Sequence, residues 1–311
     1  MLLDENNTNT GYRMSERPTM KHYFEYFILK ILILFLRILP YRHAVRFGGF
    51  IGRILWHWGI RKKVSRRNFE LCFGADIDPK YRDRVLLKSY SNFCRTAVEF
   101  ALFSKPRQKL NELVRIEGEE LLQKIKEQGK GAILVTGHFG NWELYASAIV
   151  NAGCKVSIVA GTQKNPLVDK LMNNTRELMG LEIIHIGSAG IGIMKALRSG
   201  KMVALLSDQD AHEDGVIVKF FGQPASTPAG TAMLSVKIGC PIFSGYIVRN
   251  PDGLTHTGYV RRIDFPSAEL DEQRNIQMLT QSYTEIVEEA VRKHPEQYFW
   301  AHRKFKTTLG Y

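Results

Sequence analysis

Short apolar segments alternate with amphipathic segments through the middle of the chain. Four runs have the length and composition of buried strands, at 132–136, 155–160, 182–186 and 202–207. The segments between them place apolar residues at helical spacing, at 142–152, 166–180 and 190–199. Strands and helices that alternate at this interval predict an α/β fold, in which a largely parallel sheet is covered by helices on both faces.

The pattern changes after the fourth strand. Three further strands are expected at 216–221, 241–249 and 254–263, with a helix at 228–239 between them, and they look closer to antiparallel additions to the sheet. A long helix at 270–293 closes the chain. The predicted sheet is therefore mixed, with a parallel centre.

The region before the sheet is predicted to be helical. Apolar positions recur at helical spacing from Tyr81 to Phe103, and Pro106 breaks the pattern. An amphipathic helix follows at 117–128 and ends at Gly129. We expect one domain at 41–311, made of a helical lead-in at 41–128, an α/β core at 129–265 and the C-terminal helix.

The first forty residues divide into two parts. Residues 1–21 form a polar tail rich in Asn and Thr, which we expect to be disordered. Residues 22–40 are mostly apolar from Tyr23 to Leu39, a length at the lower limit for a membrane span. Because Lys30 would be costly at the bilayer centre, a buried helix of a soluble core is one interpretation. We favour a membrane helix, which either spans shallowly or lies in the interface.

The charge of the chain is strongly basic, with 43 Lys and Arg against 31 Asp and Glu, for a net +12. Such a surface favours polyanions, which are anionic lipid, an acidic carrier protein or nucleic acid. Nucleic acid is disfavoured because no zinc-finger, RNA-recognition or basic-zipper pattern is present. Basic residues flank the indole rings of Trp56 and Trp58 and match a membrane headgroup layer or, alternatively, a solvated helix face. Arg53 precedes the two rings, and the cluster that follows them is Arg61, Lys62, Lys63, Arg66 and Arg67.

Two other signatures are weak. The four cysteines are widely spaced and show no C-x-x-C, which predicts reduced thiols and no zinc site. Gly187, Gly190 and Gly192 precede a predicted helix, but their G-x-x-G-x-G spacing differs from the dinucleotide-binding pattern. A plain turn and helix start is the simpler interpretation.

The candidate chemistry lies where the first predicted strand meets its helix. His138 follows that strand and Gly137, at the edge of the sheet where open α/β folds bind ligands. Glu143 comes five residues later and could orient the imidazole of a general base. The two side chains would meet only if His138 lies in the turn and Glu143 in the first helical turn. A backbone-bonded loop histidine and a first-turn carboxylate are the alternatives.

Several motifs in order resemble one family. GHFGNWE at 137–143 is similar to the H-x4-(D/E) motif of glycerolipid acyltransferases, in the form found in the bacterial lipid A biosynthesis acyltransferases. The resemblance runs from about Tyr23 to Lys306 and includes Asn165–Pro166 with Asp169 and Arg176, Asp208–Gln209–Asp210, Phe220–Phe221–Gly222 with Thr227, and PEQYFWAHRKFK at 295–306. It implies a glycerol-3-phosphate acyltransferase-like fold with His138 and Glu143 as catalytic residues.

The resemblance also implies a set of substrate-binding residues, each with a simpler alternative. Arg176 would hold a phosphate or a carbonyl oxygen, although a salt-bridged surface arginine is the default. Asp208 and Asp210 could instead form an Asx turn, and Thr227 could cap a helix. The full set is Lys164, Asn165, Arg176, Asp208, Asp210, Gly222 and Thr227. Thr162–Gln163–Lys164 stands where many members have Tyr-Arg-Pro, which leaves the acceptor headgroup open.

The resemblance implies that the protein is an enzyme of a bacterial inner membrane and that its catalytic domain faces the cytoplasm. It would transfer a fatty acyl chain from acyl carrier protein or acyl-CoA to a hydroxyl of a lipid A precursor or related glycolipid. No cofactor and no metal are expected. The alternatives are a lysophospholipid or other glycolipid acyltransferase, and a non-catalytic, membrane-bound lipid-binding protein.

Overall fold

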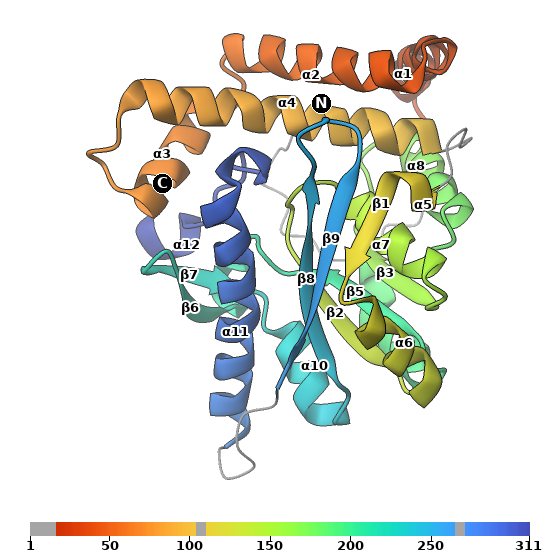
Figure 1. The fold of residues 1–311 in the computed structure, drawn as a ribbon, viewed down its shortest axis with the longest axis vertical. Helices are drawn as coiled ribbons and strands as arrows, with labels where there is room; N and C mark the ends of the chain where they lie inside the picture. Colours follow the sequence, from red (N-terminus) through yellow and green to blue (C-terminus); the bar gives the residue numbers. More distant parts are fainter. Residues whose placement is uncertain (1–16, 104–109, 265–270) are drawn as a thin grey trace.

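The computed structural model describes residues 17–103, 110–264 and 271–311, and Figure 1 shows their arrangement. Most of the predicted tail at 1–21, the Pro106 break, and the boundary at 265–270 before the last long helix lie outside these residues. Three long helices, α1 (Met20–Ile38), α2 (Tyr41–His57) and α4 (Pro79–Phe103), lie across one end of a central sheet (Figure 1).

The central sheet has seven strands in the order β1-β9-β8-β2-β5-β3-β4. Its parallel centre consists of β8 (Ile242–Arg249), β2 (Ala132–Thr136), β5 (Met202–Leu206), β3 (Val156–Ala160) and β4 (Glu182–His185). Only the β8–β9 pair is antiparallel, because β9 (His256–Ile263) returns beside β8 and pairs in parallel with β1 (Val114–Glu117). The prediction of a mostly parallel sheet is thus confirmed.

Two predictions about the later strands were wrong in part. The strands predicted at 241–249 and 254–263 do pair antiparallel as β8 and β9, but β8 is not an addition to the sheet, because it also pairs in parallel with β2 at the centre. The strand predicted at 216–221 does not join the sheet at all. It forms a separate hairpin from β6 (Val216–Phe220) and β7 (Gln223–Thr227), whose turn uses positive φ angles at Phe221 (54°) and Gly222 (76°). The short strands β1 and β7 were not predicted.

Strand β2 shows why this sequence folds into three layers. Every residue of β2 is buried, and successive side chains of a strand point to opposite faces. Leu134 packs in the cluster that includes Leu144 of α7 (Trp142–Asn151), while Ile133 and Val135 pack with Tyr283 of α11 (Glu272–Lys293). The remaining helices that flank the sheet or its ends are α3 (Lys62–Phe73), α5 (Leu110–Leu113), α6 (Glu119–Gln128), α8 (Pro166–Leu178), α9 (Ala189–Arg198), α10 (Gly230–Ile238) and α12 (Lys306–Leu309).

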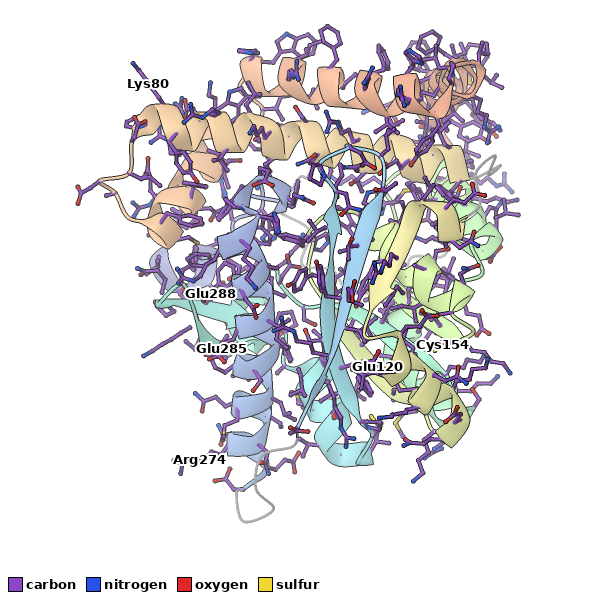
Figure 2. All side chains as sticks on the ribbon, in the orientation of Figure 1. Lys80, Glu120, Cys154, Arg274, Glu285 and Glu288 are labelled. Carbon is purple, nitrogen blue, oxygen red and sulfur yellow. The ribbon has the colours of Figure 1, made fainter. Side chains whose placement is uncertain are left out.

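Charged side chains extend from the surface of the molecule (Figure 2). Lys80, Glu120 and Arg274 lie exposed at the surface, whereas Cys154 lies buried among apolar residues. All four cysteines are buried free thiols. None of them is placed to act as an exposed nucleophile.

The N-terminal helices differ from the expectation. Within the described residues, no helix combines the length and the apolar character that a membrane crossing requires, so a transmembrane helix at 22–40 has no support. Helix α1 fully buries only Ile33 and Leu36; Tyr26 and Leu29 are half-buried, and its other large apolar side chains are exposed. Helix α2 instead packs tightly on α4, because Gly48 and Gly52 let the backbones approach. A Cβ atom on Gly52 would lie 2.2 Å from the carbonyl oxygen of Tyr90.

Candidate active site

The turn that carries His138 is built by glycines at the carboxyl end of β2. Gly137 leaves room for the Asp208 carboxylate, which would lie 3.2 Å from a Cβ atom at this position. Gly140 has a φ of 58°, and a Cβ atom there would meet the Ile247 carbonyl oxygen at 1.9 Å. Asn141 then caps α7 by accepting a hydrogen bond from the Leu144 N–H at 3.1 Å. These contacts fix His138 between strand and helix.

Asp208 holds His138 by two hydrogen bonds. The His138 backbone N–H donates to Asp208 Oδ2 at 2.9 Å, and His138 Nδ1 lies 2.7 Å from Asp208 Oδ1. Strand β5, which ends just before Asp208, lies beside β2, so both residues reach the same edge of the sheet. Because a carboxylate only accepts, Nδ1 carries the proton and Nε2 keeps the lone pair that a general base needs.

The charge of Asp208 is stable in this environment. Burial by itself raises the pKa of the Asp208 carboxyl, but the charge of His138 and its hydrogen bonds, together with the Lys304 ammonium, outweigh burial and lower the pKa to about 2. Burial, followed by the neighbouring Asp208 carboxylate, raises the pKa of Tyr298 well above its usual value. Asp208 is therefore an anion beside a neutral tyrosine at physiological pH.

Glu143 does not orient His138, which corrects the prediction from the sequence. The Glu143 carboxylate accepts from Arg176 Nη2 at 2.6 Å and from Arg176 Nε at 3.2 Å. Glu143 lies in the first turn of α7 and Arg176 in the last turn of α8, so the ion pair joins two helices. The guanidinium also lies 5.6 Å from the ring centre of Phe100.

A buried ion pair lies behind the same turn and was missed in the sequence. Glu99 of α4 accepts from both Nη atoms of Arg249 at 2.6 Å, and both side chains are almost completely buried. Glu99 also accepts from Asn141 Nδ2 at 2.7 Å. Burial opposes the ionised form of each partner, but their mutual attraction prevails, so the pKa of Glu99 is lowered and that of Arg249 is raised.

The residues predicted at the β3–α8 connection have structural contacts. Asn165 is buried, and its Oδ1 caps α8 by accepting from the Leu167 N–H at 3.0 Å. Its Nδ2 donates to the His22 carbonyl and to Glu25 Oε2 of α1, both at 3.0 Å. Lys164 is exposed in the same connection. The amide of Asn165 is thus committed to two helices rather than to an open site.

The remaining predicted residues lie around the β6–β7 hairpin and the chain end. Asp210 accepts from the Thr307 hydroxyl at 2.7 Å, which ties the loop after β5 to α12. Gly222 forms the hairpin turn, and the preceding Phe221 is buried. Thr227 is buried in β7, and Ala229 occupies the N-cap of α10, so the helix-cap interpretation of Thr227 was wrong.

An apolar cavity adjoins His138. Phe93 of α4 and Phe299 stack at 4.7 Å between ring centres, and the His138 ring centre lies 6.3 Å from that of Phe299. The Phe299 N–H donates to the His138 carbonyl at 3.1 Å, so the C-terminal segment is bound to the turn that carries His138. Both phenylalanines line the cavity together with Leu55, Ile60, Tyr90 and Cys94.

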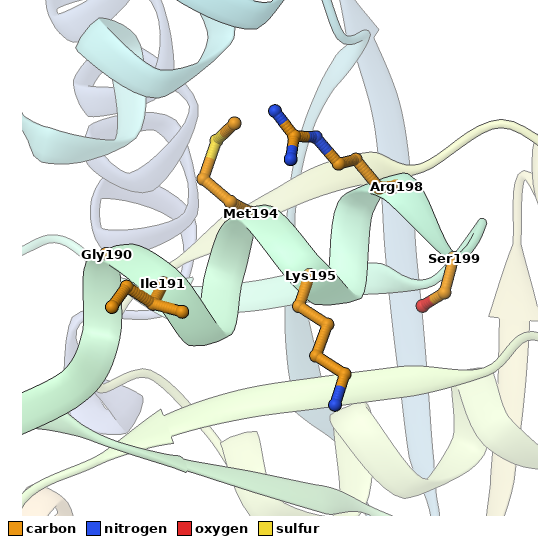
Figure 3. Close-up of a pocket in the computed structure, with 6 residues that line it drawn as sticks. All are labelled: Gly190, Ile191, Met194, Lys195, Arg198 and Ser199. Carbon is orange, nitrogen blue, oxygen red and sulfur yellow. The ribbon is translucent and has the colours of Figure 1, made fainter.

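A wide, open hollow elsewhere lacks such chemistry. It runs along α9 and is lined by residues from Gly190 to Ser199 (Figure 3). Lys195 and Arg198 point away from one another there, and no histidine or carboxylate lines the hollow. The glycines that suggested a dinucleotide pattern form a short 3-10 turn and the start of this helix.

Comparisons with known proteins show the family of the chain. The family described as bacterial lipid A biosynthesis acyltransferase matches residues 13–307, which is almost the entire chain. The chain belongs to this family. It is an acyltransferase, and the expectation drawn from GHFGNWE and the later motifs is confirmed at the level of the family.

Individual relatives of this acyltransferase act on two kinds of glycolipid. The chain is 27% identical over 273 residues to the lipid A biosynthesis lauroyltransferase of Escherichia coli K12, covering 86% of this chain and 87% of that one. It is 26% identical over 293 residues to the palmitoleoyltransferase of the same organism, covering 92% of each. A phosphatidylinositol mannoside acyltransferase of Mycolicibacterium smegmatis is 27% identical over 219 residues, covering 68% of this chain and 67% of that one.

Substitutions of Asp208 and Glu143 should have different effects on the transfer rate and on folding stability. We expect Asp208→Asn to lower the rate of acyl transfer by roughly 10²- to 10⁴-fold, because an amide no longer fixes the tautomer or stabilises the imidazolium. Glu143→Gln should cost less rate but about 1–3 kcal/mol of folding stability, because Arg176 loses its counter-charge. Transfer kinetics and chemical unfolding of both isosteric variants measure these effects. A larger rate loss in Glu143→Gln than in Asp208→Asn would reverse the assignment.

Proposed function

We propose that this acyltransferase moves a fatty acyl chain from a thioester, on acyl carrier protein or coenzyme A, to a hydroxyl of a lipid A precursor or related glycolipid. The observation that carries the proposal is the hydrogen bond between His138 Nδ1 and Asp208, which leaves Nε2 as a base at the carboxyl end of the sheet. The family relationship supports the reaction class, and the names of the relatives support a glycolipid acceptor.

The proposed reaction needs no covalent enzyme intermediate. His138 Nε2 takes the proton of the acceptor hydroxyl while its oxygen attacks the thioester carbonyl, and a tetrahedral intermediate forms. The carbon–sulfur bond then breaks, and the departing thiolate takes the proton from the imidazolium. Asp208 stabilises the imidazolium between these two steps. The products are an ester on the acceptor and a free thiol on the donor.

The neighbouring groups have separate roles in this proposal. The acyl chain would lie against Phe93 and Phe299, because a hydrocarbon chain gains from leaving water. The cavity beside them, at about 30 Å³, would have to widen to admit the chain. Arg176 donates to Glu143 from Nε and Nη2 and to Asn173 from Nη1, so an acceptor phosphate would reach this arginine only through the remaining N–H groups of Nη1 and Nη2. The net charge of +12 favours an acidic carrier protein and anionic lipid as partners.

Helix α1 is proposed to lie flat in the membrane interface rather than to cross it. Its large exposed apolar side chains are Met20, Tyr23, Phe24, Phe27, Ile28, Ile31, Leu32, Leu34, Phe35 and Ile38. A helix with an open apolar face beside a basic protein surface suits the cytoplasmic leaflet of a bacterial inner membrane. We propose this location because a lipid acceptor is presented there.

Transfer of a labelled acyl chain tests the reaction and the base together. We expect the purified protein to acylate extracted glycolipids, with the product and its chain position identified by mass spectrometry. His138→Ala should lose about 10²- to 10⁴-fold in rate, as is typical when a positioned base is removed. His57→Ala, an exposed histidine on α2, is the matched control and should stay near wild type. Substantial transfer by His138→Ala would disprove the base assignment, and no transfer by wild type to any lipid would favour a lipid-binding protein.

Chain-length preference tests the cavity. Leu55 is half-buried and lines it, so Leu55→Trp should fill space and shift the preferred donor toward shorter chains by two or more carbons. Each buried CH₂ group contributes about 0.8 kcal/mol of binding free energy, and the carbons that the indole displaces into water lose this contribution. Leu87→Trp, half-buried in the same apolar cluster but outside the cavity lining, is the control. Competition among acyl donors of different length gives kcat/KM ratios, and an unchanged ratio in Leu55→Trp would place the chain elsewhere.

Vesicle sedimentation tests the proposed interfacial helix. Phe27 and Ile31 are 62% and 51% exposed and lie one helical turn apart. The double variant Phe27→Asp with Ile31→Asp should bind anionic vesicles at least ~10-fold more weakly, since two apolar side chains no longer gain about 1.5–3 kcal/mol each. Ile191→Asp with Ile217→Asp, at positions that are 82% and 49% exposed, adds the same charge away from α1. An equal loss of vesicle binding in both double variants would show that the added negative charge, and not the apolar face of α1, accounts for the effect.

A further inference from the structure

A buried lysine lies next to the carboxylate that holds His138. Lys304 is only 3% exposed, although lysine is almost never fully buried without a partner. It belongs to the segment between Trp300 and α12, and its Nζ lies 5.1 Å from the ring centre of Phe220. Lys304 and Asp208 line the same small cavity of about 10 Å³ with Thr136, Ser207 and Thr284.

The charged and titratable groups around this cavity come from several elements. Lys304 faces the carboxylates of Asp208 and Asp210, from the loop after β5, and the Cys72 thiol of α3. Asp208 in turn faces His138 from the β2–α7 turn and Tyr298 from the C-terminal segment. Burial lowers the pKa of Lys304, and the two carboxylates act against this effect. Burial raises the pKa of Cys72 above its usual value, so the thiol is neutral and Asp208 is the buried anion that Lys304 compensates.

We infer that Lys304 is a positioning residue for His138: from the protein interior its ammonium offsets part of the charge of Asp208, so that the imidazole held by this carboxylate stays neutral and ready to accept a proton. The inference rests on the proposed role of His138 as the base. A buried carboxylate with no opposing cation would favour the imidazolium, which cannot accept a proton. His138 contributes more than Lys304 to keeping Asp208 ionised, so the carboxylate stays charged when Lys304 is removed.

Removal of the Lys304 ammonium changes the electrostatic balance at His138. In Lys304→Met, the Asp208 charge acts on His138 without the opposing ammonium, so the imidazolium form is favoured. The neutral base then appears only at higher pH, and the acid limb of the kcat/KM profile should move up by about half to one pH unit, as expected for the loss of a nearby charge. Lys306→Met, two residues along and partly exposed, should leave the profile in place.

A structural role alone would give a different result. If Lys304 only fills space, Lys304→Met lowers stability or protein yield, but the acid limb does not move, and this outcome overturns the inference. Because Lys304 acts through Asp208, Lys304→Met should change the rate several-fold in the wild-type background and have almost no effect in Asp208→Asn. Additive losses in the double variant also overturn it. Lys304→Gln, which keeps a hydrogen-bond donor, replaces Lys304→Met if the methionine variant does not fold.

An independent measurement separates this inference from the proposed function. The titration of the His138 imidazole can be followed by NMR in the full-length protein, with His138→Gln used to assign the signal. Its midpoint should lie at higher pH in Lys304→Met than in wild type, whether or not His138 is the catalytic base. An unchanged midpoint overturns the role of Lys304, whereas transfer that persists in His138→Ala overturns only the proposed base.

Discussion

The site depends on a pair of opposite charges that is almost completely removed from water. Glu99 of α4 and Arg249 at the end of β8 make two hydrogen bonds of 2.6 Å. Breaking such a buried pair by removing one partner costs about 3–5 kcal/mol, because the remaining charge stays buried. Since Glu99 also accepts from Asn141, the helix that lies across the sheet edge holds the turn that presents His138. The turn that carries His138 is therefore held in place by a buried salt bridge that lies outside the proposed chemistry.

Contacts within one strand–turn–helix unit could be predicted from the sequence, and contacts between units could not. The strand at 132–136 and the helix after Asn141 follow from local composition and capping, and both formed as expected. The partner of His138 depends on which strand lies beside β2. Strand β5 is 70 residues further along the chain, and apolar patterning alone does not fix strand order. The sequence therefore suggested Glu143, the nearest carboxylate along the chain, whereas Asp208 is the carboxylate that binds the imidazole.

The same reason explains the other errors. A short strand such as β1, with four residues, gives too few positions for alternation to be detected. Strand β8 looked like an antiparallel addition because its partner β9 follows it directly, while its parallel contact with β2 spans more than 100 residues. The apolar run at 23–39 was correctly read as a helix, but hydrophobicity alone did not tell whether it crosses a bilayer.

The side chain of Asn165 joins two helices, α1 and α8. It caps α8, and its amide nitrogen binds the first turns of α1, while α8 carries Arg176 at its opposite end. A membrane-bound helix with a flexible link to its domain would leave the distance between the membrane surface and the active site variable. The amide of Asn165 and the packing of α1 on α4 and α8 fix α1 against the domain. With α1 in the proposed interfacial position, the depth of α1 in the headgroup layer would set the distance between Nε2 of His138 and the plane of the headgroups.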